Sequence, residues 1–133
     1  MSRKIEDLTP ETQEKFYEFK RRMEEAGIPF MVTSTFRSQA EQVQLYAQGR
    51  TTPGKIVTWT RNSRHTKRDA FDVAILKQGK PVWDIKVDVN EDDIPDYQQA
   101  GEIGESCGLE WGGRFKNKKG KPRPDYPHFQ VKA

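Results

Sequence analysis

The sequence is poor in the two residue types that small proteins most often use for covalent links and metal binding. Its 133 residues include one cysteine, Cys107, and two histidines, His65 and His128. A single cysteine excludes an intramolecular disulfide and any metal site built from several thiolates. The two histidines are therefore the only imidazoles available for metal binding or acid–base chemistry.

Long apolar runs are also missing. No stretch approaches the roughly 18 apolar residues that a membrane-spanning helix needs, so we expect no membrane anchor. The first seven residues carry several charges and are not followed by an apolar stretch, a pattern that differs from a secretory signal. We therefore expect the protein to be made and kept in the cytoplasm unless another component releases it.

Apolar and charged residues are nearly balanced, at 33% and 32% of the chain. This composition is typical of a soluble protein with a modest core and a heavily solvated surface, and we interpret residues 1–133 as a single, monomeric domain. The net charge is +3, and a basic run lies between Arg114 and Arg123. Such a run can bind polyanions. Nucleic-acid binding depends on this run alone, so we expect no nucleic-acid partner.

The hydrophobic pattern predicts helices and strands without regular βαβ alternation. We expect an α+β domain in which a small, mostly antiparallel sheet carries the functional site and helices cover its other face. Thr9-Pro10-Glu11 and the pair Ser38 and Glu41 are typical of helix starts. The predicted helices run from Thr9 to Gly27, from Ser38 to Gly49 and from Ile94 to Gly108. The predicted strands cover residues 29–36, 56–60, 70–76, 81–84 and 126–131, and residues 109–113 are predicted as a strand followed by a turn.

Each histidine has a carboxylate nearby in the sequence. Asp72 follows His65 by seven residues, which suits a loop histidine before a strand, and Asp125 precedes His128 by three. Zinc hydrolases typically hold the metal with three side chains and leave a fourth position for solvent. His65, Asp72 and His128 can form such a set, with Asp125 as the general base. From spacing alone, a surface or core role for either histidine stays open.

Four segments of the chain resemble a known peptidase family, the VanY-type zinc D-alanyl-D-alanine carboxypeptidases. Within it the chain is most similar to the bacteriophage L-alanyl-D-glutamate endopeptidase endolysins. The similarity extends from about Val32 to Val131. Its segments are Ser34-Thr35-Phe36-Arg37-Ser38 with Gln42, Ser63-Arg64-His65, Ala70-Phe71-Asp72 and Asp125-Tyr126-Pro127-His128.

The resemblance implies a role for each matching residue. It implies zinc on His65, Asp72 and His128, with Asp125 as the base. It also implies that the substrate is contacted from Arg37, Ser63, Gln42 and Trp111, the last from a Trp-Gly-Gly segment that resembles one near the family's active cleft. The implied fold is the Hedgehog/D-Ala-D-Ala peptidase-like sheet that carries a zinc site.

The function implied by this resemblance is hydrolysis of the L-Ala-D-Glu bond in the peptidoglycan stem peptide. An endolysin of this kind degrades the bacterial cell wall for host lysis, after release from the host cytoplasm across the inner membrane. Two alternatives stay open. One is a D-Ala-D-Ala carboxypeptidase of the same family, and the other is a non-catalytic, zinc-containing binding module on the same fold.

The chain departs from the family pattern at two positions. Arg68 stands where many relatives have glycine, so a positive φ angle at this position would be strained for arginine. Asp125 stands where many relatives have glutamate, and its side chain is one methylene shorter. Neither departure removes a predicted zinc ligand.

Overall fold

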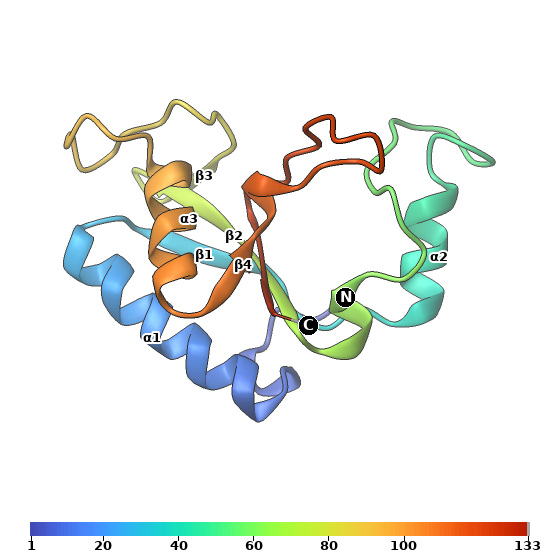
Figure 1. Cartoon of the computed structure of the whole chain (residues 1–133), viewed down its shortest axis with the longest axis horizontal. Coiled ribbons are helices and arrows are strands. Elements are labelled where there is room, and N and C mark those ends of the chain that lie inside the picture. Colours follow the sequence, from blue (N-terminus) through green and yellow to red (C-terminus); the bar gives the residue numbers. More distant parts are fainter. Residues whose placement is uncertain (133) are drawn as a thin grey trace.

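The computed structural model describes residues 1–132 and shows an antiparallel sheet packed against helices (Figure 1). The strand order is β1-β2-β5-β4, and β3 also pairs with β2. The α+β fold predicted from the sequence is confirmed. The strands are β1 (Phe30–Ser34), β2 (Ala70–Lys77), β3 (Lys80–Val82), β4 (Leu109–Trp111) and β5 (His128–Val131). The helices are α1 (Pro10–Ala26), α2 (Gln39–Ala47) and α3 (Asp96–Ser106), with short 3-10 helices η1 (Ile5–Asp7), η2 (Arg64–Lys67) and η3 (Gly112–Arg114).

The helix boundaries follow from local sequence signals. Thr9 caps α1 by accepting a hydrogen bond from the Thr12 amide, and Gly27 ends this helix with a φ of 73°. Ser38 and Glu41 form the predicted capping box at the start of α2. These two predicted helix starts are confirmed, and the third predicted helix begins as α3 at Asp96, close to the predicted Ile94. None of the helices within residues 1–132 is both long and apolar enough to cross a membrane.

One face of the sheet forms the hydrophobic core together with α1 and α3. Phe71 of β2 stacks on Phe129 of β5, with ring centroids 5.5 Å apart, and Phe19 of α1 contacts both rings. Helix α3 lies very close to β4 at Gly101. A Cβ atom built on this residue would come within 2.1 Å of the Trp111 ring, so only glycine allows the close approach. This packing fixes which face of the sheet is turned away from the core.

Side chains alternate across a strand, so the neighbours of the core residues point to the opposite face. In the antiparallel pairing of β2 with β5, Phe71 faces Phe129 and Asp72 faces His128. The aspartate and the histidine are therefore cross-strand partners on the face opposite α1 and α3. Helix α2 and two long loops, 48–63 and 112–127, lie on that side of the molecule (Figure 1).

The strand predicted for residues 56–60 is absent, and this prediction was wrong. The segment is an irregular loop in which Val57 and Trp59 are 56% and 58% exposed. Its β-branched residues favour a strand, but the loop has no neighbouring strand to pair with. Gln42 of α2 holds it instead, by donating to the Thr60 carbonyl over 2.7 Å.

Candidate active site

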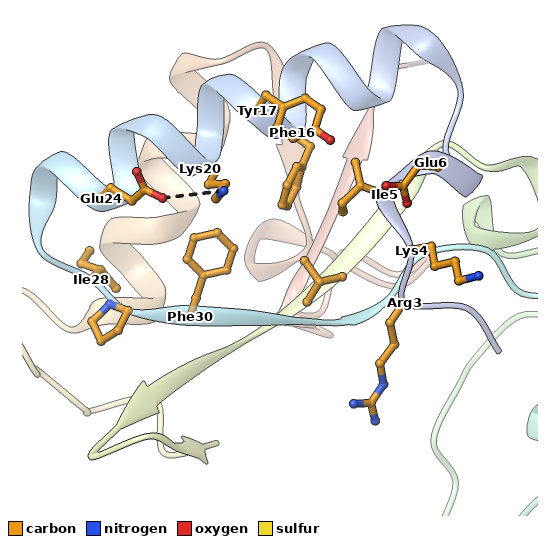
Figure 2. A pocket seen from close by; sticks show the side chains of 12 residues that line it. Arg3, Lys4, Ile5, Glu6, Phe16, Tyr17, Lys20, Glu24, Ile28 and Phe30 are labelled. Carbon is orange, nitrogen blue, oxygen red and sulfur yellow. Dashed lines mark ion pairs between the residues drawn. The ribbon is translucent and has the colours of Figure 1, made fainter.

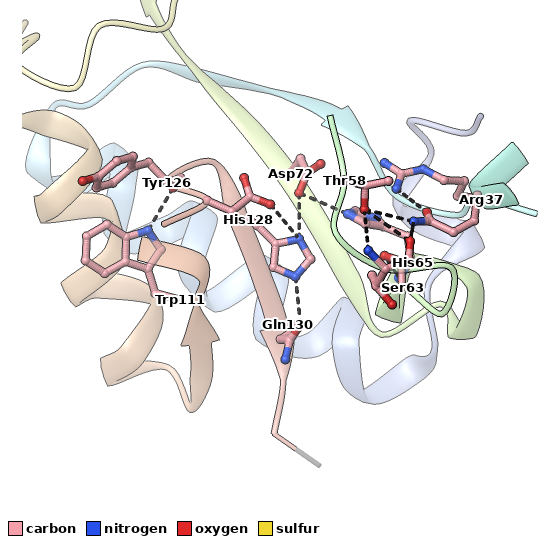
Figure 3. Close-up of polar contacts among 12 residues, drawn as sticks. Arg37, Thr58, Ser63, His65, Asp72, Trp111, Tyr126, His128 and Gln130 are labelled. Carbon is pink, nitrogen blue, oxygen red and sulfur yellow. Dashed lines mark hydrogen bonds and ion pairs between the residues drawn. The ribbon is translucent and has the colours of Figure 1, made fainter. Parts of the chain in front are cut away.

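Three of the predicted site residues meet at one point on the polar face of the sheet (Figure 3). Asp72 Oδ1 lies 3.0 Å from His128 Nδ1 and 3.1 Å from His65 Nε2. Asp72 and His128 come from adjacent strands, and His65 is carried by η2, the turn that leads into β2. One potential ligand atom from each residue lies within 4.8 Å of the other two. The structure therefore brings the predicted ligand set together.

Both imidazoles are held by a partner on the side away from Asp72. His65 Nδ1 donates to the Thr35 carbonyl over 2.7 Å, and His128 Nε2 lies 2.8 Å from Gln130 Oε1. The Thr35 carbonyl can only accept, so the proton of a neutral His65 sits on Nδ1 and its Nε2 presents a lone pair. Contacts of this kind fix ring orientation and tautomer in metal sites.

A cation fits the point where the three side chains converge. If each imidazole turns a nitrogen lone pair toward the same Asp72 oxygen, the lone pairs and the carboxylate repel one another. A proton or a cation between these atoms removes the repulsion. Zinc–ligand bonds of about 2.0–2.2 Å separate tetrahedral ligand atoms by about 3.3–3.6 Å. The distances of 3.0 and 3.1 Å from Asp72 Oδ1 lie just below that range, so a small outward movement of the side chains admits the ion. Two imidazoles and one carboxylate are also donors that zinc prefers.

Burial and hydrogen bonding shift the pKa values in this cluster in opposite directions. Burial disfavours ionised Asp72, but the hydrogen bonds that His128 and His65 donate to it when their rings are protonated outweigh burial and hold the pKa of this carboxyl below its usual value. Burial also disfavours the charged form of His128, yet its hydrogen bond with Asp72 leaves its pKa above the usual value. Asp72 thus stays ionised, as a metal ligand must.

Asp125 lies at the mouth of the cluster, with Oδ2 4.0 Å from His128 Nδ1. Its side chain is 53% exposed, but the cleft around it removes enough water to raise the pKa of the carboxyl, an effect that the charge of nearby His128 partly offsets. The Asp125 amide donates to the Gly112 carbonyl over 2.8 Å. The carboxylate is therefore near the cluster without being one of its three converging donors. Its role as a base stays a prediction.

Gly112 permits this close approach. A Cβ atom at this position would come within 2.3 Å of the Asp125 carbonyl oxygen and 2.9 Å of His128 Cβ.

We expect Gly112→Ala to displace both residues and to lower kcat/KM by about 100-fold, because displacements near 1 Å have effects of that size. The measurement is the steady-state rate of the hydrolysis that the sequence resemblance implies, recorded beside a thermal unfolding curve. A folded Gly112→Ala protein with unchanged kcat/KM would contradict this prediction.

Arg37 and Ser63, both predicted as substrate contacts, line the cleft around the cluster. The Ser63 hydroxyl also caps η2 by accepting from the His65 amide over 3.2 Å. Burial lowers the pKa of Arg37, and the carboxylates Asp72, Glu41 and Asp125 offset part of that effect. Arg37 is thus a partly desolvated cation that faces the cluster, a suitable partner for a substrate carboxylate or carbonyl.

Gln42 and Trp111, also predicted as substrate contacts, are placed differently. Gln42 is fully buried and accepts from Arg37 Nη1 over 2.7 Å, so it positions Arg37 and the 58–60 loop instead of touching the cleft. Trp111 is 4% exposed, and its indole donates to the Tyr126 carbonyl over 2.9 Å on the core side (Figure 3). The prediction of direct substrate contact is therefore corrected for both residues, because neither side chain reaches the cleft.

The cleft has a volume of about 550 Å³ and is also lined by residues outside the predicted set of metal ligands, base and substrate contacts. Phe115, Pro124 and Arg123 form one wall, and Val57 and Trp59 form part of another. The basic run gave only a general signal for Arg123. A separate hollow between α1 and β1 is lined by the apolar side chains of Phe16 and Phe30 (Figure 2) and holds none of the cluster residues.

Arg68 has the backbone geometry anticipated for a glycine position. Its φ is 63°, in the left-handed region, and its amide closes η2 by donating to the His65 carbonyl over 3.3 Å. The guanidinium donates to the Asp7 carbonyl over 2.9 Å and lies 4.0 Å from the centroid of the Phe36 ring. These two contacts offset the strain of a non-glycine residue at this position.

Comparisons with known proteins relate this chain to cell-wall peptidases. Residues 57–131 match a family described as D-alanyl-D-alanine carboxypeptidase. The chain is 38% identical over 128 residues to the peptidoglycan L-alanyl-D-glutamate endopeptidase CwlK of Bacillus subtilis (strain 168), covering 94% of this chain and 74% of that protein.

Solved structures show the same fold. The L-Ala D-Glu endopeptidase ChiX of Serratia marcescens superposes with a TM-score of 0.70 at 23% identity, covering 96% of this chain and 83% of the other. VanYB in complex with D-alanine-D-alanine gives a TM-score of 0.61 at 14% identity, with 93% and 71% covered. At these identities the likeness establishes the architecture of the sheet and its helices.

Proposed function

Because this chain belongs to the D-alanyl-D-alanine carboxypeptidase family, we propose that it is a zinc-dependent peptidoglycan peptidase that hydrolyses the L-Ala-D-Glu bond of the stem peptide. The convergence of His65, Asp72 and His128 in an open cleft beside Asp125 is the observation that carries this proposal. The 38% identity to an L-alanyl-D-glutamate endopeptidase favours this bond over a terminal D-Ala. The bacteriophage origin and the role in host lysis stay predictions from the sequence resemblance.

His65, Asp72 and His128 would hold the zinc ion. When bound, zinc supplies a Lewis acid that polarises the scissile carbonyl and lowers the pKa of water. With neutral imidazoles and ionised Asp72, the three ligands leave one net positive charge at the site. The contacts of Thr35 with His65 and of Gln130 with His128 keep both rings in the orientation that ligation needs.

The remaining steps belong to the residues around the cluster. Asp125 accepts a proton from the attacking water and returns it to the departing amine, a role that suits a carboxylate with a raised pKa. Arg37, held by Gln42, orients the substrate through a carboxylate or carbonyl oxygen. Ser63 lines the cleft beside His65 and can add a hydrogen bond to the peptide.

A digest of purified peptidoglycan, read by mass spectrometry, tests the proposed bond. We expect products with a new N-terminal D-Glu and glycan strands that keep L-Ala, and we expect a chelator to stop the reaction and added Zn²⁺ to restore it. Release of free D-Ala with intact L-Ala-D-Glu bonds would instead identify a carboxypeptidase. Bound zinc without any cleavage would favour the non-catalytic binding module.

A further inference from the structure

A basic hollow opens beside the catalytic cleft. Among the described residues its lining contains no carboxylate, whereas the catalytic cleft contains Asp72 and Asp125. Trp59, Phe115 and Arg123 line both spaces, so the two are adjacent. The residues of the basic hollow are Trp59, Phe115, Lys116, Asn117, Lys118, Lys119, Lys121 and Arg123.

The lysines of this hollow are carried by a folded segment, the basic hairpin of residues 115–123. The Arg123 amide donates to the Phe115 carbonyl, and the Asn117 amide donates to the Lys121 carbonyl, each over 2.8 Å. The Asn117 side chain accepts from the amides of Lys119 and Lys121, each over 2.9 Å. These bonds give the hairpin a defined shape, so its charges have defined positions beside the cleft.

An aromatic–cation contact joins the hairpin to the opposite loop. The Arg123 guanidinium lies 4.0 Å from the centroid of the Trp59 ring, although Trp59 remains 58% exposed. The two loops approach each other on the side of the sheet that carries the cluster (Figure 1). Trp59 thus provides a largely exposed aromatic side chain where the catalytic cleft adjoins the basic hollow.

The cations of the hairpin have no acidic partner within residues 1–132. Arg114, just before the hairpin, is paired with Glu105 over 3.1 Å. In the same part of the chain, Arg123 and the four lysines of the hairpin form no ion pair. Like charges gathered in one hollow repel one another and attract an anionic ligand. This arrangement is suited to binding several carboxylates of one ligand.

The proposed role of Asp125 sets the direction in which a substrate would run. Asp125 protonates the departing amine, so the leaving part of the substrate lies on its side of the cleft. Arg123 is two residues before Asp125, and the basic hollow begins there. If the L-Ala-D-Glu bond is cut, the leaving part begins with D-Glu, which uses one of its two carboxyl groups for the next peptide bond and keeps the other free. The far end of the leaving peptide carries a terminal carboxylate.

We infer that the basic hairpin and Trp59 form a subsite for the carboxylates of the leaving peptide, on the C-terminal side of the scissile bond. This inference rests on the proposed function, since it needs a stem peptide in the cleft. The lysines supply positive charge, and Trp59 supplies an aromatic surface for the peptide backbone. The subsite sets which peptides the enzyme prefers, whereas the cluster and Asp125 perform the hydrolysis.

The kinetic test compares two soluble stem peptides, one with free carboxylates and one with the carboxylates beyond the scissile bond amidated. In the combined variant Lys116→Ala, Lys118→Ala, Lys119→Ala and Lys121→Ala, we expect KM for the free-acid peptide to rise about tenfold. The variant loses several attractions between lysines and carboxylates, each of which is weakened by solvent screening. KM for the amidated peptide should change less than twofold. The matched control is Lys77→Ala, Lys80→Ala, Lys86→Ala and Lys132→Ala, which removes four exposed lysines elsewhere. Equal KM changes for both peptides, or a loss mainly in kcat, would overturn the inference.

A binding measurement separates this inference from the proposed function. Isothermal titration calorimetry with the zinc-loaded protein and the peptide D-Glu-diamino acid needs no cleavage. Suppose that the hairpin variant binds this peptide about tenfold more weakly than the unmodified protein, and that the unmodified protein cuts neither stem peptide. This result would support the subsite and refute the proposed peptidase function. Unchanged binding would overturn the subsite whether or not the peptides are cut. Tighter hairpin-dependent binding of a DNA duplex or a teichoic-acid polyphosphate, at the same ionic strength, would overturn the assignment to carboxylates.

Discussion

His128→Ala should lower the zinc content of the purified protein from about one ion per chain to near zero and reduce peptidase activity by more than about 100-fold. Loss of a partner that merely orients a metal ligand typically costs 10- to 100-fold, and loss of the ligand itself should cost more. Only His65 and Asp72 would remain of the three converging residues. Elemental analysis and the peptidoglycan digest measure the two effects.

Two further variants show whether this loss is specific to ligation. Gln130→Ala keeps the imidazole but removes its contact with His128 Nε2, so we expect zinc affinity to fall by about 10- to 100-fold with partial activity retained. Gln98→Ala, on the exposed surface of α3, should match the unmodified protein. Full zinc content in a folded His128→Ala protein would rule out the proposed ligand set.

Asp125→Asn should reduce kcat by about 10²- to 10⁴-fold while leaving the zinc content unchanged. Asparagine nearly preserves the shape of the side chain, but its amide cannot take a proton from water or return one to the leaving amine. Asp125 is not one of the three residues whose donor atoms converge, so the metal should stay bound. Steady-state kinetics and elemental analysis on the same preparation separate these two effects.

Asp125→Glu is the informative partner of this variant. It retains the carboxylate, and many members of the resembled family have glutamate at this position, so we expect it to keep much of the activity that Asp125→Asn loses. Asp93→Asn removes the same charge from an exposed loop that does not line the cleft, so this control should leave the rate unchanged. A normal rate in Asp125→Asn would remove Asp125 from its role as general base.

The sequence predicted much of the local structure, because caps and turns depend on a few neighbouring residues. Ser38 and Glu41 form their capping box, and Gly27 ends α1 in the left-handed region. The sequence also predicted which residues would meet at the cluster, but only in combination with the family resemblance. Spacing alone could not show that Asp72 and His128 are cross-strand partners, since strand register depends on pairing across the whole sheet.

The errors arose where the same residue pattern can serve two purposes. The β-branched run 56–60 has the composition of a strand, but it pairs with no strand of the sheet and lines the cleft instead. Trp111 comes from a segment resembling one near the family's cleft, yet the alternation along β4 turns its ring toward the core. The role of the basic hairpin stayed open between a solvated loop and a surface for an anionic partner such as the cell wall, because charge composition does not reveal what lies beside it.

The cross-strand pairing of Asp72 with His128 links assembly of the sheet to enzymatic competence. These two residues are separated by 56 positions in the chain, so a partly synthesised or partly folded protein lacks the complete donor set. A slip of β5 by one residue would turn His128 into the core and Phe129 into the cleft. An ion held jointly by both strands would oppose such a slip, and the appearance of hydrolysis during refolding should therefore report docking of the last strand.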